Sequence, residues 1–416
     1  MAVSGLARSA LLEVAPFKMG MKGRKSSSKN PPILSHEFVI QNHADIVSCV
    51  AMVFVIGLMF QVSSPIAYMF IAVHHNVSSG PEEVARDPSV YYTYGWKDLG
   101  PVFFYFLICI VMHAIIQEYV LDKISRKMHL SKAKHSKFNE SGQYLIFFII
   151  SILWGGDIIF RENLFLNIPS LWEDYPHVLM PFMLKFFFMI QFSYWAHCFP
   201  ELYFQKVKRE EMASRIRYAL LHFTFILAAY LLNFNRVGIC LLVYHYVSEA
   251  LFHAARLIYF ADKTESGSKG VFMVANAVFI IVRLVSIVFS VLTFWYGLRL
   301  APQGLDIAAG NFNTEFIRII ALCAVCILQA WLMWNLITLH LRRLREQAPK
   351  NSSSAGSAAN NARKQRQERR KEAQNKKKKD AESKRGAYDD VNDLPEVDQN
   401  TKKNLRARAT AAQKAK

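Results

Sequence analysis

The chain has 416 residues, of which 52% are hydrophobic, and it carries a formal net charge of +18. Its hydrophobic residues gather in long blocks, and about 20 helical residues are enough to cross a hydrocarbon core of roughly 30 Å. The composition therefore excludes a soluble globular protein. The six cysteines lie within or beside the same blocks, which argues against an extracellular domain held by disulfides.

Eight hydrophobic blocks are long enough to be transmembrane helices. The third is the weakest, because Gly155, Gly156 and Asp157 interrupt it, and polar residues lower the sixth, so seven spans remain the alternative. We predict an all-α fold, a polytopic membrane bundle of about eight transmembrane helices. The blocks are 48–73, 99–121, 144–162, 178–199, 216–234, 237–260, 271–298 and 316–340.

The charges of the connecting segments predict the orientation. Lys and Arg are frequent in the first 45 residues, in 122–137 and in 206–215, whereas 162–177 holds none. Because these residues favour the cytosolic side, we expect both termini to be cytosolic. The sequon that begins at Asn76 falls on the opposite, lumenal side, so we predict that Asn76 is glycosylated.

The same pattern divides the chain into four segments. A cytosolic amino-terminal segment covers 1–45, two transmembrane helices with a lumenal loop cover 46–121, a six-helix core covers 122–340, and a disordered basic cytosolic tail covers 341–416. The tail holds 22 Lys and Arg against 10 Asp and Glu, and so supplies +12 of the net charge. It could bind anionic lipid or ribosomal RNA, although a solvated positive anchor is the simpler interpretation.

The sixth block contains a polar stripe. Helical spacing places His245, Ser248, Glu249 and His253 on one face of a helix that is otherwise apolar. Ionisable groups at membrane depth are costly and normally face a bundle interior or a wet cavity. The stripe is therefore the main candidate for a functional site.

Other charged residues lie inside the hydrophobic blocks, notably Lys185 and Arg283. We expect Arg283 to approach Glu249, because each needs a charge partner at a similar depth. His245 and Glu249, one turn apart, could act as a general base and its orienting group. From spacing alone we favour a structural hydrogen-bond cluster between helices, and no phosphate loop, nucleophile elbow or zinc helix is present in the sequence.

Five runs of sequence resemble the translocating chain-associated membrane protein (TRAM) family. The resemblance covers about residues 22–346. It implies a multi-pass protein of the endoplasmic reticulum membrane that lies beside the protein-conducting channel and contacts signal sequences and transmembrane segments of nascent chains. It implies no enzyme activity, no metal and no cofactor. The runs are 31–38 (PPILSHEF), 41–49 (QNHADIVSC), 119–124 (YVLDKI), 134–143 (KHSKFNESGQ) and 199–206 (FPELYFQK).

The central region also resembles the TLC domain shared with ceramide synthases, which makes 122–340 a TLC-like core. The matching pattern is Asn233-x-x-Arg236-Val237-Gly238 followed by His245-x-x-Ser248. The synthases have paired histidines upstream, where this chain has a single His222, and an Asp where this chain has Tyr246. These departures imply a retained fold with a non-catalytic cavity.

We therefore predict a polar, membrane-facing groove that eases the passage of an apolar nascent segment into the bilayer. Two alternatives remain, namely a lipid-binding protein and a ceramide-synthase-like acyltransferase. The acyltransferase would require His222 and His245 to lie close together, with a cytosolic entry for acyl-CoA. The groove residues that we nominate are Lys185, His222, Asn233, His245, Ser248, Glu249 and Arg283.

Overall fold

The computed structural model describes residues 35–77, 90–261 and 266–347. The chain forms two compact units, 1–343 and 344–416, and nearly all of the described residues belong to the first. Most of the predicted amino-terminal segment and nearly all of the predicted basic tail fall outside the described residues. The expectations for those two segments remain predictions.

Helices make up most of the described chain, as the sequence predicts. The additions are a small antiparallel sheet of two-residue strands, β1 (Asn76–Val77), β2 (Tyr91–Tyr92) and β3 (Met180–Pro181), paired in that order. The helices are α2 (His36–Gln41), α3 (His43–Gly57), α4 (Ser64–Ile71), α6 (Leu99–Ile115), α7 (Asp122–Lys127), α8 (Lys132–Arg161), α9 (Phe182–Phe204), α10 (Arg209–Leu231), α11 (Asn235–Ala261), α12 (Ser266–Ser290) and α13 (Glu315–Gln347).

Five helical runs are long and apolar enough to cross a membrane, which fits a polytopic bundle. Helices α9 and α10 have comparable length, 23 residues each, but they carry more polar side chains. Short helical turns extend α6 and α12, so each of these runs is longer than its α-helix. The five runs are Trp96–Lys127, Lys134–Arg161, Asn235–Ala261, Gly267–Arg299 and Glu315–Arg345.

The first hydrophobic block is not one helix. Helix α3 ends at Gly57 after 15 residues, about 22 Å of helix at 1.5 Å per residue, which is too short to cross the hydrocarbon core. Pro65 lies in the first turn of α4, where its missing N–H costs no hydrogen bond. The hydroxyl of Ser63 donates to the Gly57 carbonyl at 2.8 Å and so satisfies the end of α3.

The third block is continuous, although glycines and Asp157 made it the weakest in the sequence. Helix α8 runs unbroken from Lys132 to Arg161, and Asp157 pairs with Arg161 on the exposed surface at 2.8 Å. A Cβ on Gly155 would collide with Val243 of α11. The glycine therefore allows α8 and α11 to pack closely.

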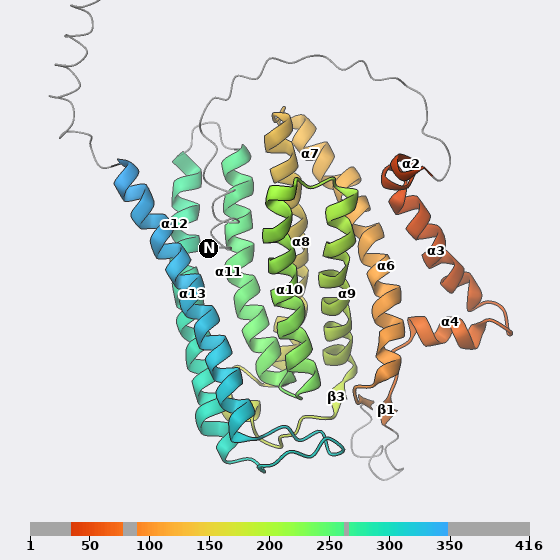
Figure 1. The fold of residues 1–416 in the computed structure, drawn as a ribbon, viewed down its shortest axis with the longest axis vertical. Coiled ribbons are helices and arrows are strands. Elements are labelled where there is room, and N and C mark those ends of the chain that lie inside the picture. The colour runs from red at the N-terminus through yellow and green to blue at the C-terminus, as the bar shows by residue number, and fades with distance from the viewer. Residues whose placement is uncertain (1–34, 78–89, 262–265, 348–416) are drawn as a thin grey trace, which may run out of the picture. The chain divides into compact units, whose positions relative to one another are not determined.

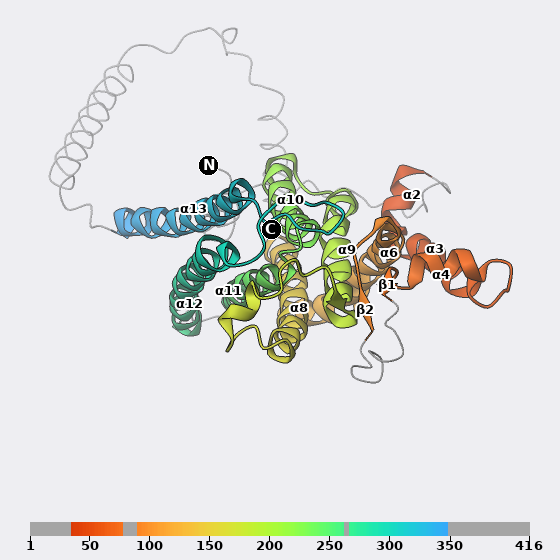
Figure 2. The same cartoon turned by 90° about the horizontal axis from the view of Figure 1, so that it is seen from below.

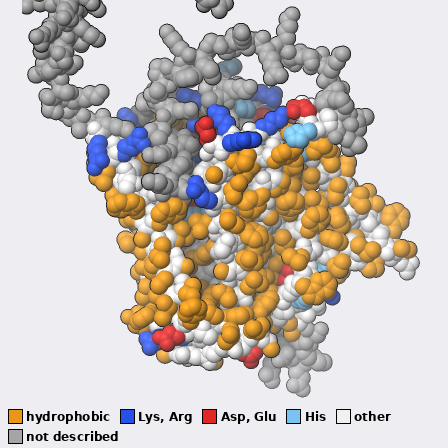
Figure 3. Space-filling model, viewed as in Figure 1, with side chains coloured by type: hydrophobic (Ala, Val, Ile, Leu, Met, Phe, Trp, Pro, Cys, Tyr) orange, Lys and Arg blue, Asp and Glu red, His pale blue; other side chains and the backbone are white. Residues whose placement is uncertain are grey.

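The long helices lie side by side and connect two chemically different ends (Figure 1). We call the end that holds 122–137 and 206–217 the basic end, and the opposite end, which holds the three strands, the strand end. Helix α11 packs between α8 and α12, α9 packs between α6 and α10, and α3 and α4 pack on α6. Figure 3 shows hydrophobic side chains covering the middle of this face, with Lys and Arg gathered at the basic end.

The core lies where α8, α9, α10 and α11 meet, and aromatic side chains dominate it. Trp195, Tyr246, Phe148 and Phe187 are fully buried there. Trp195 donates from its indole nitrogen to the Tyr246 hydroxyl at 2.9 Å, and that hydroxyl donates to Gln191 at 2.7 Å. A buried hydrogen-bonded chain thus fixes the packing of α9 against α11.

A buried ion pair joins the strand end to the bundle. The ammonium of Lys185, which is fully buried, lies 2.7 Å from Oδ1 of Asp98 and donates to the carbonyls of His74 and Thr93. Tyr230 of α10 donates to the other Asp98 oxygen at 2.9 Å. One cation therefore connects the start of α9 to the segments on both sides of β2.

We predict that Lys185→Met lowers the free energy of unfolding by about 3–5 kcal/mol, because Asp98 would remain buried without its cation. The matched substitution Arg161→Met breaks an exposed Arg–Asp pair and should cost under about 1 kcal/mol. Chemical denaturation of the two purified variants and the parent measures both values. Equal losses in the two variants would contradict this role for Lys185.

Candidate functional site

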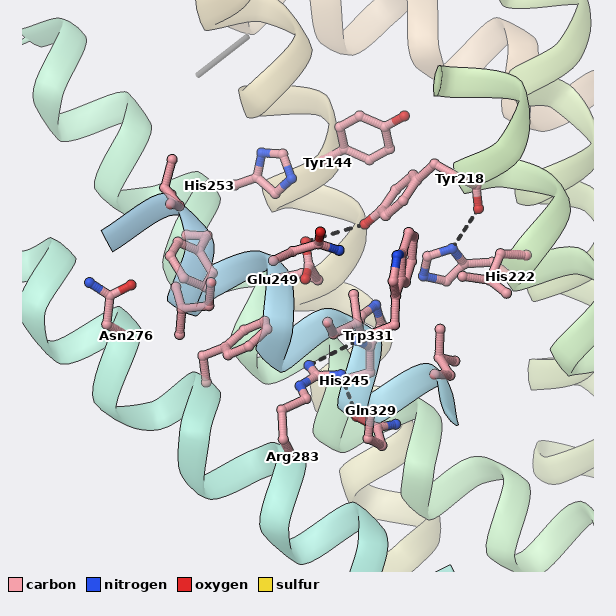
Figure 4. A pocket seen from close by; sticks show the side chains of 18 of the residues that line it. Tyr144, Tyr218, His222, His245, Glu249, His253, Asn276, Arg283, Gln329 and Trp331 are labelled. Atoms are coloured by element: carbon pink, nitrogen blue, oxygen red, sulfur yellow. Dashed lines mark hydrogen bonds between the residues drawn. The ribbon is translucent and has the colours of Figure 1, made fainter. Parts of the chain in front are cut away.

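The bundle contains a cavity of about 210 Å³ that is partly open. Side chains from α10, α11, α12 and α13 line it, together with Tyr144 of α8 (Figure 4). Helix α13 lies beside α10 at the strand end and diverges from it toward the basic end (Figures 1 and 2). The cavity therefore lies between α10, α11, α12 and α13.

Arg283 of α12 is the central polar group of this cavity. Its side chain is 1% exposed, and it donates to Gln329 of α13 at 2.9 Å and to the Ser248 hydroxyl at 2.6 Å. A third contact joins Nη2 to Nδ1 of His245 at 3.0 Å. The guanidinium also lies over the ring of Phe279, 4.5 Å from its centroid. Arg283 thus connects α12 to α11 and α13.

The contact with Arg283 fixes the tautomer of His245. A guanidinium has only donors, so Nδ1 of His245 must accept. In the neutral ring the proton then lies on Nε2. His245 is therefore arranged as a donor toward the cavity and not as a free base.

The structure places most of the polar stripe along the cavity. His245, Glu249 and His253 all line the cavity, one helical turn apart. Ser248 is fully buried and faces Arg283. Tyr218 of α10 donates to Glu249 at 3.3 Å, so the stripe also contacts the neighbouring helix.

Glu249 and Arg283 share the cavity but are not an ion pair. No carboxylate lies within 4.0 Å of the Arg283 guanidinium among the described residues. Its hydrogen-bond partners are neutral side chains. The two groups therefore line the same cavity, but they do not form the charge pair that the sequence led us to expect.

His222 lies on the opposite wall, on α10. Its ring stacks on Trp195 with centroids 3.9 Å apart, and its Nδ1 donates to the Tyr218 carbonyl at 2.8 Å. The rings of His222 and His245 are 5.1 Å apart. Nε2 of His222 is buried without a hydrogen-bond partner in the described part of the chain.

Two nominated groove residues lie elsewhere. Lys185 belongs to the ion pair with Asp98 at the strand end. Asn233 forms the turn between α10 and α11, where it has a φ of 56° and donates to the Gly310 carbonyl at 2.8 Å. Asn tolerates this left-handed conformation better than most residues. The sequence shows that both are polar at membrane depth but not which way each side chain faces.

Sequence reasoning missed much of the cavity lining. Gln329, Asn335 and Trp331 come from α13, Asn276 comes from α12, and Tyr144 comes from α8. Gln329 and Asn335 were visible as polar residues within the last hydrophobic block. Their contribution depends on α13 lying against the cavity, which no pattern in the sequence specifies. In the described chain, no group of three or more His, Cys, Asp and Glu side chains is placed to hold a metal ion.

Comparisons with known proteins cover the same region. A family model described as the TLC domain matches residues 137–338, from the first turns of α8 into α13. Two curated relatives are Translocating chain-associated membrane protein 2 of Homo sapiens and that of Mus musculus. Each is 47% identical over 320 residues, which make up 77% of this chain and 85% of the relative.

We predict that Gln329→Leu lowers the free energy of unfolding by about 1–3 kcal/mol, because one N–H of the buried Arg283 loses its acceptor. Gln303→Leu is the matched control, since Gln303 is exposed and its side chain donates to the Arg299 carbonyl. It should change stability by under about 0.5 kcal/mol. Denaturation of the purified variants in detergent measures both values. An unchanged free energy of unfolding in Gln329→Leu would contradict the contact between Gln329 and Arg283.

Proposed function

Because this chain belongs to the translocating chain-associated membrane protein family, we propose that it assists protein translocation at the endoplasmic reticulum by contacting nascent signal sequences and transmembrane segments. Its relatives carry the name of that process. The observation that supports the proposal is the partly open cavity between apolar helices, whose wall includes polar groups.

The cavity offers a nascent segment two kinds of contact. Apolar side chains such as Phe225, Leu328 and Leu332 make up most of its wall, and they suit an apolar helix as lipid does. His245 and Glu249 add hydrogen-bonding groups that lipid lacks. A segment that carries a polar residue would gain partners there that the hydrocarbon core does not supply.

The proposed binding needs neither a cofactor nor a metal, because no covalent bond forms or breaks. The protein would select nascent segments by the length of their apolar stretch and by the charge of the residues that flank it. The partners that we propose are the protein-conducting channel, the nascent segment and the surrounding lipids, with the ribosome as a further partner of the basic tail. Both termini would face the cytosol, and Asn76 would carry a glycan in the lumen.

We predict that replacing the stripe with His245→Phe, Ser248→Ala and Glu249→Gln together lowers photocrosslinking to a nascent chain about fivefold or more. The loss of one net hydrogen bond, worth about 1 kcal/mol, already weakens binding about fivefold. The crosslinker sits in the apolar core of a signal sequence, in microsomes that contain or lack the protein. Thr338→Val, outside the cavity on α13, is the control. An unchanged crosslink in a well-expressed triple variant would refute the proposal.

Acyl transfer is the second candidate, and one observation favours it. His222 and His245 are 5.1 Å apart, which satisfies the proximity that such chemistry would require. His222 keeps the lone pair of Nε2 available, because its Nδ1 carries the proton. The hydrogen bond from Arg283 to His245 opposes the candidate, since it leaves His245 without a free lone pair.

We expect purified protein to form no product from labelled acyl-CoA and a sphingoid base. His245 cannot accept a proton at Nδ1 while Arg283 donates to it, so the pair lacks one of its two bases. The measurement is a product assay on the parent and on His222→Gln. Product that disappears with His222→Gln would establish acyl transfer and displace the binding proposal.

A further inference from the structure

The basic-end part of the cavity contains a buried arginine without a hydrogen-bond partner for two of its nitrogens. Arg256, five residues before the end of α11, is 7% exposed and lines the cavity. Its Nε and Nη2 atoms are buried and have no partner among the described residues. A buried guanidinium whose donors lack acceptors is costly unless a ligand supplies them.

Charges of both signs lie near Arg256, namely Arg215, Glu140 and Glu211. Arg343 and His340 of α13 line the same part of the cavity. Glu249 is the one carboxylate among the described lining residues, and it lies seven residues deeper, about 10 Å along α11. The nearby Glu140 is held by Arg215 at 2.9 Å. This end of the cavity therefore suits an anion.

A second unpartnered donor lies deeper in the cavity. Nδ2 of Asn335 is buried and has no acceptor in the described chain, and Asn335 precedes Arg343 by about two turns of α13. Between and beyond them the wall is apolar, with Phe252, Phe279 and Leu336. From the basic end inward, the cavity therefore offers cations and then a neutral donor beside an apolar wall, with Glu249, His245 and Arg283 deeper still.

The geometry points to an anionic glycerophospholipid as a ligand of this cavity. Its phosphate lies between Arg256 and Arg343, an ester carbonyl accepts from Asn335, and one acyl chain runs inward along the apolar wall. Arginine binds phosphate with charge-assisted and often bidentate hydrogen bonds. The lipid goes beyond the proposed contact with nascent chains, and its binding is measured with no nascent chain present.

At this end the charge favours a lipid headgroup over the positive flank of a peptide, whose apolar core would contact the deeper stripe. A signal sequence or transmembrane segment carries its Lys and Arg on the cytosolic flank, and those cations would meet Arg256 and Arg343. A lipid brings a negative group to the same place. The cavity is partly open, so a lipid can enter it from outside the bundle.

The test uses the full chain reconstituted in nanodiscs of phosphatidylcholine with a minor fraction of photoactivatable phosphatidylserine. We expect Arg256→Gln and Arg343→Gln each to lower phosphatidylserine labelling about fivefold, at about 1 kcal/mol per basic residue. Labelling by a photoactivatable phosphatidylcholine should be weaker in the parent and unchanged in both variants. Arg217→Gln is the matched control, because Arg217 is exposed at the same end but outside the cavity.

Each outcome decides the assignment. Equal labelling by the two lipids, or an equal loss with Arg217→Gln, would overturn it, because general surface charge would then explain the binding. Competition by soluble glycerophosphoserine would also overturn it, since the headgroup alone would then suffice. Arg343 is half-buried near the end of α13, so Arg343→Gln tests the site even where Arg256→Gln fails to fold.

Discussion

Arg283 is the residue on which the cavity depends. A guanidinium at membrane depth must have its donors satisfied by protein, because the hydrocarbon core supplies no acceptors. Here the acceptors for its two terminal nitrogens come from α11 and α13, through Ser248, His245 and Gln329, while Nε is buried without a partner in the described chain. The need to solvate one cation therefore brings three helices together around a polar centre. The same contacts orient His245, so the electrostatics of the cavity follow from the packing.

Lys185 and Arg283 are both deeply buried cations, but they play different roles. Lys185 has a carboxylate partner and two backbone acceptors. Its contacts therefore connect the strand end to the bundle. Arg283 has neutral partners and lines an open cavity. A satisfied ion pair has little left to offer a ligand, whereas a cation among neutral acceptors leaves the cavity with positive potential.

The departures from the synthase pattern have structural consequences. Tyr246 stands where the resemblance implies an acid, and its hydroxyl bridges Trp195 and Gln191 inside the core. An ionised carboxylate at that place would lack a cation. His222 stacks on Trp195, so the upstream histidine also belongs to the aromatic core. The region therefore keeps a cavity, while Tyr246 and His222 take part in the packing of the aromatic core.

The sequence by itself determined the helical membrane class and the face of α11 that carries His245, Glu249 and His253, because hydrophobic length and helical period are local properties. It could not show that Lys185 and Asn233 lie outside the cavity, because a residue at the same depth as the cavity can face any neighbouring helix. It also did not show that the first block breaks after Gly57, or that Gln329 would meet Arg283. Only the tertiary structure decided those points, because they depend on which helices lie beside each other and on how each is rotated about its axis.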